Sequence, residues 1–183
     1  MLKKLARFRK NKSGVAAVEF GLIAPVMATM LLGTIEVCNA LQCKQKVTSI
    51  ASSVADLVAQ TKSVSGTDIT NIFSAANALV YPFSSTNSSI VVSSVLSDGN
   101  GNGTVAWSKA QNGTPLATNS AVVVPTGLMS ASTCARGACS VILAQVSYAY
   151  SSPLGKIIVG TNNMTDYFYA RPRKSATVTY SGS

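Results

Sequence analysis

A long apolar run near the N-terminus is the dominant feature of the hydropathy pattern. Apart from Glu19, residues 15–35 carry no charge, and most of them are apolar. At 1.5 Å per residue a helix over this run is about 32 Å long, which is enough to cross a bilayer core of about 30 Å. The run therefore predicts a transmembrane helix over residues 15–35.

Beyond Glu36 the apolar positions recur every three or four residues, which is typical of a helix with one buried face. Polar residues occupy the adjoining positions. The spacing predicts that the helix continues to Lys62, so that residues 15–62 form one long helix whose second half packs on a domain. Pro25 lacks a backbone donor and predicts a kink in the first half. The apolar positions of the second half are Ala40, Cys43, Val47, Ile50, Val54 and Leu57.

A second helix is predicted after a break at residues 63–67. Thr67 can cap its N-terminus, and the helix is expected to run to Val80 because Pro82 stops it. Its apolar positions share one side, where core packing is the expected role. They are Ile69, Ile72, Phe73, Ala76 and Leu79.

After Ser84 the pattern changes to the alternation that is typical of strands. The segment 139–150 alternates most regularly and is expected to lie centrally in a sheet. The other predicted strands are 90–96, 104–110, 122–124, 167–169 and 176–180.

The predicted fold class is α+β. A long N-terminal helix, membrane-spanning in its first half, would pack on an antiparallel β-sheet head domain at the C-terminal end. Residues 1–14 form a basic leader, residues 15–62 the long helix and residues 63–183 the head domain.

Positive charge is concentrated at the N-terminus. The net charge is +9, but the first twelve residues hold six basic and no acidic side chains, and without them the charge is +3. By the positive-inside rule the basic end stays in the cytoplasm and the chain after Glu36 lies outside. The high pI therefore gives no indication of nucleic-acid binding, and nucleic acid is not an expected partner.

Glu19 and Gly14 call for a functional interpretation. A carboxylate inside a membrane helix costs about 2.5–3.5 kcal/mol even on the lenient scale, and Gly14 alone separates the basic leader from the apolar run. A secretory signal has a shorter apolar region followed by a small-residue cleavage site, so it explains the run poorly. An uncleaved signal anchor explains the span but neither Glu19 nor Gly14.

The basic leader, Gly14, four small apolar residues and the pair Glu19-Phe20 together resemble the cleavage site of a type IV prepilin. The segment 14–26, with Gly33-Thr-Ile-Glu36 beyond it, is similar to the TadE-like family of pilin-like proteins of the bacterial tight-adherence (Flp) pilus system. Phe20 stands where the Flp branch has a tyrosine. The resemblance covers about the first 60 residues.

The resemblance implies a minor pilin or pseudopilin with the lollipop plan of pilins. A prepilin peptidase would cut after Gly14 on the cytoplasmic side and leave Val15 at the new N-terminus. The implied location is the bacterial inner membrane, with a cytoplasmic N-terminus and a head in the periplasm, or outside the cell within a pilus. The implied partners are this peptidase, other pilins or pseudopilins, inner-membrane assembly proteins and membrane lipid; no cofactor is expected.

Physical chemistry gives Glu19 a role in assembly. Cleavage would free the α-amino group of Val15, whose reference pKa is about 8, so that it is mostly cationic near neutral pH. In a bundle of such helices Glu19 of one subunit can pair with that amine on a neighbour. Because an unpaired charge in a low dielectric is strongly penalised, the pair favours a fixed stagger between subunits. Glu19 is therefore a predicted assembly residue, and the resemblance of the pair Glu19-Phe20 to the Glu-Tyr pair of the Flp branch implies the same role for Phe20.

The chain has four cysteines and no histidine. Cys134 and Cys139 flank a turn-like insert, which outside the cytoplasm predicts a local disulfide. Cys38 and Cys43 are expected on one helix with their Cα atoms roughly 8–9 Å apart, beyond the limit of about 7 Å for a disulfide, and their role stays open. These spacings without histidine do not fit a zinc site.

The Gly/Asn-rich loop between the strands predicted at 90–96 and 104–110 has two interpretations. The favoured one is a hairpin turn, because Gly and Asn tolerate positive φ. The other is a calcium loop, since Asp98, Asn100 and Asn102 match the opening half of an EF-hand motif. Its twelfth position is Lys109 instead of a bidentate glutamate, so these residues are weak calcium candidates and no metal site is predicted.

The composition argues against an enzyme. Without histidine the chain cannot build a Ser-His-Asp or Cys-His nucleophile, and no Gly-rich phosphate loop carries the required lysine. The few acidic residues form no persuasive catalytic pair. A chain of this kind is expected to act by being assembled.

Three function hypotheses follow. The first is a minor pilin or pseudopilin that is cut after Gly14 and takes part in pilus assembly, priming or tip formation. The second is an adhesin or DNA-binding module, in which Arg171, Arg173 and Lys174 beside two tyrosines form a possible binding surface. The third is an uncleaved single-pass membrane scaffold of the pilus machine.

Overall fold

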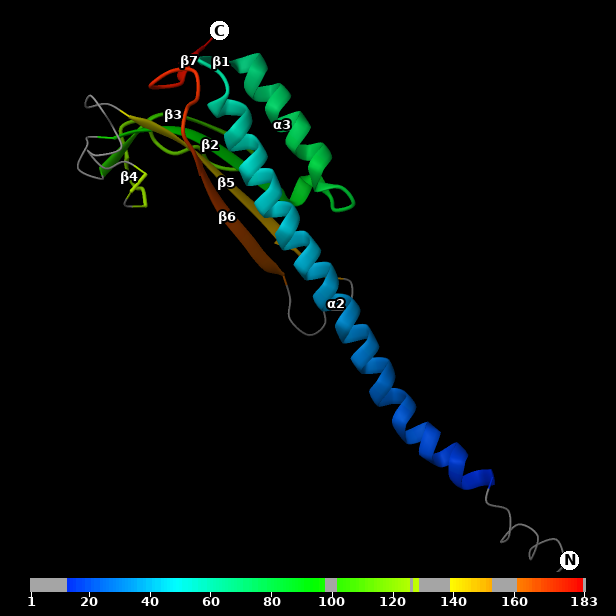
Figure 1. The fold of residues 1–183 in the computed structure, drawn as a ribbon. Helices are drawn as coiled ribbons and strands as arrows, with labels where there is room; N and C mark the ends of the chain where they lie inside the picture. The colour runs from blue at the N-terminus through cyan, green and yellow to red at the C-terminus, as the bar shows by residue number, and fades with distance from the viewer. Residues whose placement is uncertain (1–12, 98–101, 126, 129–138, 153–160, 183) are drawn as a thin grey trace, which may run out of the picture. The chain divides into compact units, whose positions relative to one another are not determined.

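The computed structural model describes residues 13–97, 102–125, 127–128, 139–152 and 161–182. The chain divides into two compact units, Met1–Ala40 and Leu41–Ser183. One helix, α2 (Ser13–Ala59), contributes its first part to the first unit and its second part to the second (Figure 1).

The first unit consists, where it is described, of the apolar part of α2. The helix is long and apolar enough to cross a membrane, and none of its most apolar stretch is buried within the protein. It continues through Pro25 without interruption. The hydroxyls of Thr29 and Thr34 donate to the carbonyl oxygens of Val26 (2.8 Å) and Met30 (2.9 Å). Both threonines thus satisfy their polar groups within the helix, as a lipid environment requires.

The second unit is built on a five-stranded antiparallel sheet with the strand order β4-β3-β2-β5-β6. Strand β2 lies in the middle, and β5, the predicted central strand, is the interior strand beside it. The predicted hairpin is confirmed by the antiparallel pairing of β2 with β3. The strands are β2 (Ser88–Ser97), β3 (Asn102–Gln111), β4 (Ala121–Val123), β5 (Ser140–Tyr150) and β6 (Asn162–Ala170), and the short 3-10 helix η1 (Ser85–Asn87) precedes β2.

A second, two-stranded sheet joins the two ends of the head. Strand β1 (Ser63–Ser65) pairs in parallel with β7 (Thr179–Ser181). The segment predicted as a plain break therefore contains a strand, and the segment predicted at 176–180 pairs with it instead of with the main sheet. Burial explains the difference. Val64 of β1 is fully buried, so its backbone groups need hydrogen-bond partners within the protein, and the pairing with β7 supplies them.

Helix α3 (Gly66–Val80) is capped by Ser65, two residues before the predicted cap at Thr67. The amide of Asp68 donates to Ser65 Oγ (3.2 Å), and the amide of Ser65 donates to Asp68 Oδ2 (2.9 Å). This reciprocal capping box satisfies two donors at the helix start, which Thr67 cannot do. The prediction of Leu79 in the core is also wrong, because Val80 is buried in its place and Leu79 is 39% exposed.

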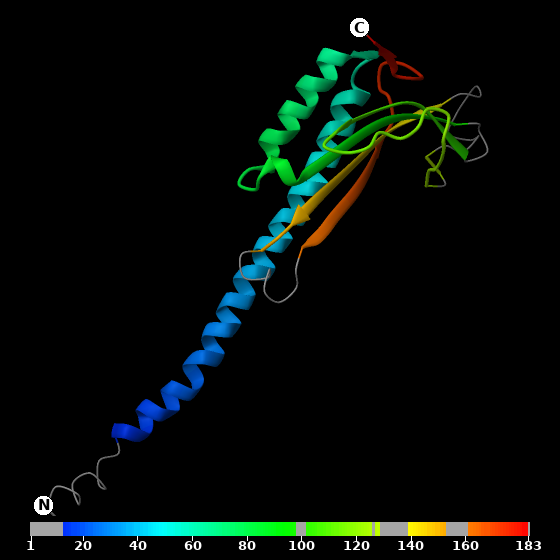
Figure 2. The same ribbon diagram turned by 180° about the vertical axis from the view of Figure 1, so that it is seen from behind.

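The main core lies between the helices and one face of the sheet. Figures 1 and 2 show α3 beside the head part of α2, both against the same face. The predicted apolar stripe of α2 is buried from Cys43 to Val54, but Leu57 is exposed and Val58 continues the stripe. The sheet contributes Ile90, Val92, Ile142, Ala144 and Val146. The opposite face carries a smaller cluster of Val95, Val124, Val141 and Leu143. This architecture confirms the predicted α+β class, with a long helix packed on an antiparallel sheet.

Candidate functional site

The predicted processing site lies in the first turn of α2, which begins at Ser13. The backbone at Gly14 is uncrowded: a Cβ atom placed there would meet no atom within 4 Å. Val15 is 58% exposed. Among the described residues, therefore, no packing contact demands glycine at position 14.

Glu19 lies one helical turn beyond Val15 on the exposed surface of α2. No described residue forms a hydrogen bond or ion pair with its carboxylate, and Phe20 beside it is 72% exposed. Because Thr29 and Thr34 bond within the helix, Glu19 is the polar side chain of residues 15–35 that needs a partner from outside. A carboxylate in such a setting favours a cation on a neighbouring chain.

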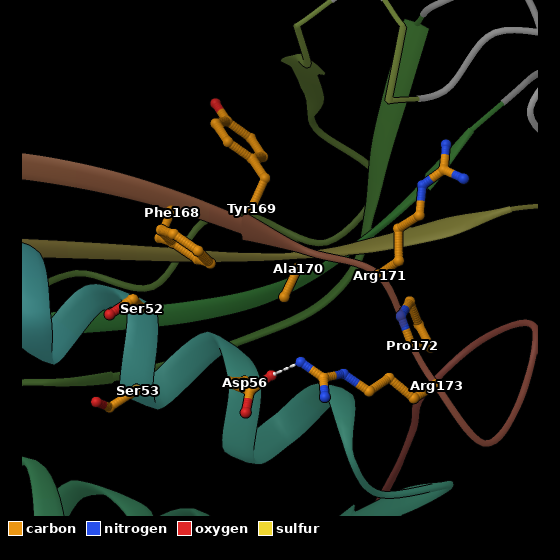
Figure 3. Close-up of a pocket in the computed structure, with 9 residues that line it drawn as sticks. All are labelled: Ser52, Ser53, Asp56, Phe168, Tyr169, Ala170, Arg171, Pro172 and Arg173. Carbon is orange, nitrogen blue, oxygen red and sulfur yellow. Dashed lines mark hydrogen bonds and ion pairs between the residues drawn. The ribbon is translucent and has the colours of Figure 1, made fainter.

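A cleft of about 580 Å³ opens between the head part of α2 and residues 168–173, at the end of β6 (Figure 3). Arg173 closes one end, because its guanidinium forms an ion pair with Asp56 of α2 and its amide donates to the carbonyl of Ala59 (2.8 Å). Gln60 Nε2 donates to the second oxygen of Asp56 (2.6 Å). The lining is Ser52, Ser53, Asp56, Phe168, Tyr169, Ala170, Arg171, Pro172 and Arg173.

A second polar contact joins α2 to β6 nearer the start of the strand. The hydroxyl of Thr48 donates to Asp166 Oδ2, and Lys44 Nζ lies 3.4 Å from the same oxygen. Lys44 Nζ also donates to the carbonyl of Thr165 (2.8 Å). The Thr48 hydrogen bond, helped by the charge of Lys44 and the amide of Tyr167 and opposed by partial burial, lowers the pKa of Asp166 below its usual value.

This pKa direction gives a pH-dependent prediction. The stabilisation from Asp166 is complete above the usual pKa of about 3.9 and is lost as the pH falls through the lower folded-state pKa. Asp166→Asn should cost about 1 kcal/mol near neutral pH, because the pair is partly solvated. Urea unfolding of the full chain in detergent, at several pH values, measures the difference. It should shrink on acidification below about pH 4; a difference that is constant with pH would contradict this role of the carboxylate.

Of the three basic residues proposed as a binding surface, two form contacts within the head. Arg173 pairs with Asp56, and Arg171 donates to the carbonyl of Leu128. Figure 3 shows their side chains pointing in different directions. Lys174 is exposed and forms no ion pair within the described part of the chain. Two of the three cations are thus used in contacts within the head.

The remaining predicted site residues are partly outside the described chain. Cys134 lies outside it, so the Cys134–Cys139 disulfide stays a prediction, as does the weak calcium site, of whose residues Asp98 and Asn100 lie outside and Asn102 begins β3. Cys38 is exposed, Cys43 is buried, and neither is bonded. Within the described ranges, no three His, Cys, Asp or Glu side chains gather as a metal site would require.

The contacts between α2 and the β6 segment were not found from the sequence. Their partners are 117 to 121 positions apart, so no local spacing relates them. The only available signal was that Lys44, Thr48 and Asp56 lie on the non-core side of the amphipathic helix.

The fold and the site define an α+β protein with a helix long and apolar enough to cross a membrane, in which the apolar run 15–35 carries one carboxylate, Glu19. The family described as TadE-like protein matches residues 14–56, nearly the whole of α2, and this match confirms the resemblance. No curated protein and no solved structure matches the chain. The match and the apolar helix together support a membrane-anchored protein associated with the tight-adherence (Flp) pilus.

Proposed function

We propose that the chain is a minor pilin or pseudopilin of a tight-adherence pilus system. A prepilin peptidase removes residues 1–14, the apolar part of α2 holds the product in the inner membrane, and the head lies in the periplasm. The subunit then joins other pilins and inner-membrane assembly proteins, where it acts in assembly, priming or tip formation. The proposal gives the chain no catalytic step.

Glu19 is the observation that carries this proposal. The apolar run of α2 satisfies its threonine hydroxyls internally and leaves one carboxylate without a described partner. Keeping a charged side chain inside the membrane costs about 2.5–3.5 kcal/mol. A helix that served only as an anchor would have no use for such a charge. A free α-amino group on Val15 of a neighbouring subunit would offset the cost, and cleavage after Gly14 creates that group.

The environment of Gly14 supports recognition by another protein. Since no described neighbour crowds this position, the fold does not explain why a glycine separates the leader from the helix. A peptidase that must approach the backbone closely does explain it, because glycine has no Cβ.

The head supports a minor role. Its five-stranded sheet, two-stranded sheet and α3 make it much bulkier than a subunit that repeats at every position of a thin filament. A few copies at one end of a filament are compatible with such a head.

The intact mass of the protein, isolated from membranes with and without an active prepilin peptidase, tests the proposal. We expect the active strain to yield a chain that begins at Val15 and the inactive strain to yield the full chain. Gly14→Leu should block cleavage, because the added side chain obstructs backbone access, whereas Gly21→Leu, at an equally uncrowded helical position, should be cut.

A full-length mass in both strains would contradict the proposal. The alternative would then be an uncleaved single-pass scaffold of the pilus machine, which has the same anchor and head but no free amine at Val15. The two functions therefore differ in processing and assembly.

A further inference from the structure

The two edges of the five-stranded sheet differ in how they are protected. On the β6 edge, Lys44 Nζ binds the carbonyl of Thr165 (2.8 Å), and the amide of Tyr167 donates to Asp166 Oδ1 (3.1 Å). Side chains thus occupy backbone groups that a further strand would need. Charged side chains on an edge are a common protection against added strands.

The β3 edge is covered only along its first half. Strand β4 pairs with residues 102–104, and the amide and carbonyl of Val105 bond to Ser120 (3.0 Å) and Asn119 (2.8 Å). Residues 107–111 pair with β2 on their inner side, and Ala106 stands at a shift of register. No described strand or loop forms backbone hydrogen bonds with residues 106–111 on the outer side. The chain that follows β3 turns away from this edge, since Leu116 packs against the apolar cluster on the opposite face of the sheet. It therefore adds no strand beside residues 106–111.

A hollow of about 340 Å³ lies between α3 and this open part of β3. Its apolar floor includes Ile69 and Phe73, both nearly fully buried. Tyr180 of β7 forms another wall. The complete lining is Gly66, Ile69, Thr70, Phe73, Ser74, Lys109, Ala110, Gln111 and Tyr180.

Two polar groups at the hollow lack an oppositely charged or hydrogen-bonding partner among the described residues. Lys109 Nζ lies 4.1 Å from the centre of the Tyr180 ring, and no described carboxylate lies within ion-pair distance of it. Gln111 Oε1 is shielded from solvent and accepts no hydrogen bond from the described residues. Lys109 is the only charged side chain of the lining, so the hollow presents a single cation beside an open strand edge.

We propose that an extended peptide segment of a partner protein binds here as an added strand along residues 106–111. One of its apolar side chains would fill the hollow over Ile69 and Phe73, and a carboxylate would pair with Lys109. Strand addition draws its affinity from main-chain hydrogen bonds and its specificity from side-chain pockets. A single lysine is too little charge to hold a polyanion, which favours an acidic peptide.

Trp107 provides the measurement, because it is the only tryptophan of the chain and its ring centre lies 6.0 Å from that of Tyr180. The full chain in detergent is titrated with capped peptides of alternating valine and threonine in which each threonine in turn is replaced by glutamate. At least one glutamate peptide should change the Trp107 fluorescence saturably, and the matching lysine peptide should bind about tenfold more weakly.

Matched variants distinguish binding at this site from non-specific binding of the peptides. Lys109→Gln should remove the preference for glutamate, whereas Lys46→Gln, at an exposed cation on α2, should retain it. Thr70→Arg, at an exposed lining position of α3, should block binding without changing the urea midpoint. Amide exchange should slow within residues 106–111. A chain that binds none of the glutamate peptides, keeps the preference after Lys109→Gln, or shows slowed exchange only elsewhere would overturn the proposal.

Discussion

Glu19→Ala is expected to leave cleavage after Gly14 intact and to abolish entry of the chain into a pilus assembly. The variant removes the carboxylate that would pair with the amine of Val15 on a neighbouring subunit. Loss of one partner from a buried ion pair costs about 3–5 kcal/mol, equivalent to a hundredfold or greater loss of association, at about 1.4 kcal/mol per factor of ten. Mass spectrometry of the membrane fraction reports cleavage, and the amount of the chain in sheared surface material reports assembly.

Two further variants distinguish a charge effect from a change in helix packing. Glu19→Gln keeps the size of the side chain and removes its charge, so it should fail as Glu19→Ala does. Val18→Ala changes the neighbouring exposed side chain and should assemble normally. Normal assembly of Glu19→Gln would show that shape or hydrogen bonding, instead of charge, is what this position supplies.

Local sequence patterns predicted those helices and strands that depend on the spacing of neighbouring apolar and polar residues. The period of apolar residues gave the buried face of α2 up to Val54, because burial and helical period are directly linked. Alternation gave the strands, and β5 is interior as expected. Gly14 and Glu19 could be selected from the sequence because a charge within an apolar run is visible without a structure.

The failures have definite physical causes. A strict alternation of steps of three and four placed Leu57 in the core, but a straight helix has 3.6 residues per turn and drifts relative to a 3.5-residue repeat, so Val58 takes that place. Thr67 suits an N-cap by residue type alone, but Asp68 completes a capping box with Ser65, and the cap therefore lies at Ser65. The β1–β7 pairing and the contacts of α2 with Asp166 and Arg173 join residues more than a hundred positions apart, where no local pattern operates.

Ile50→Ala is expected to destabilise the head strongly, by about 2–5 kcal/mol. Ile50 is 2% exposed in the core between α2 and the sheet, so its truncation removes buried apolar surface and leaves a cavity. The loss is large against the total of about 5–15 kcal/mol that stabilises an ordinary domain. Urea unfolding of the full chain in detergent, followed by the fluorescence of Trp107, measures the shift in the midpoint.

Leu57→Ala on the same helix is the matched control and should change the free energy of unfolding by no more than about 0.5 kcal/mol, because Leu57 is 41% exposed and surface changes are usually of this size. Comparing Leu57→Ala with Val58→Ala tests which face α2 turns toward the core, since adjacent residues of a helix differ by about 100° around its axis. A larger loss for Leu57→Ala than for Val58→Ala would mean that the helix presents the face given by the regular spacing. The opposite order requires the face on which Val58 is fully buried.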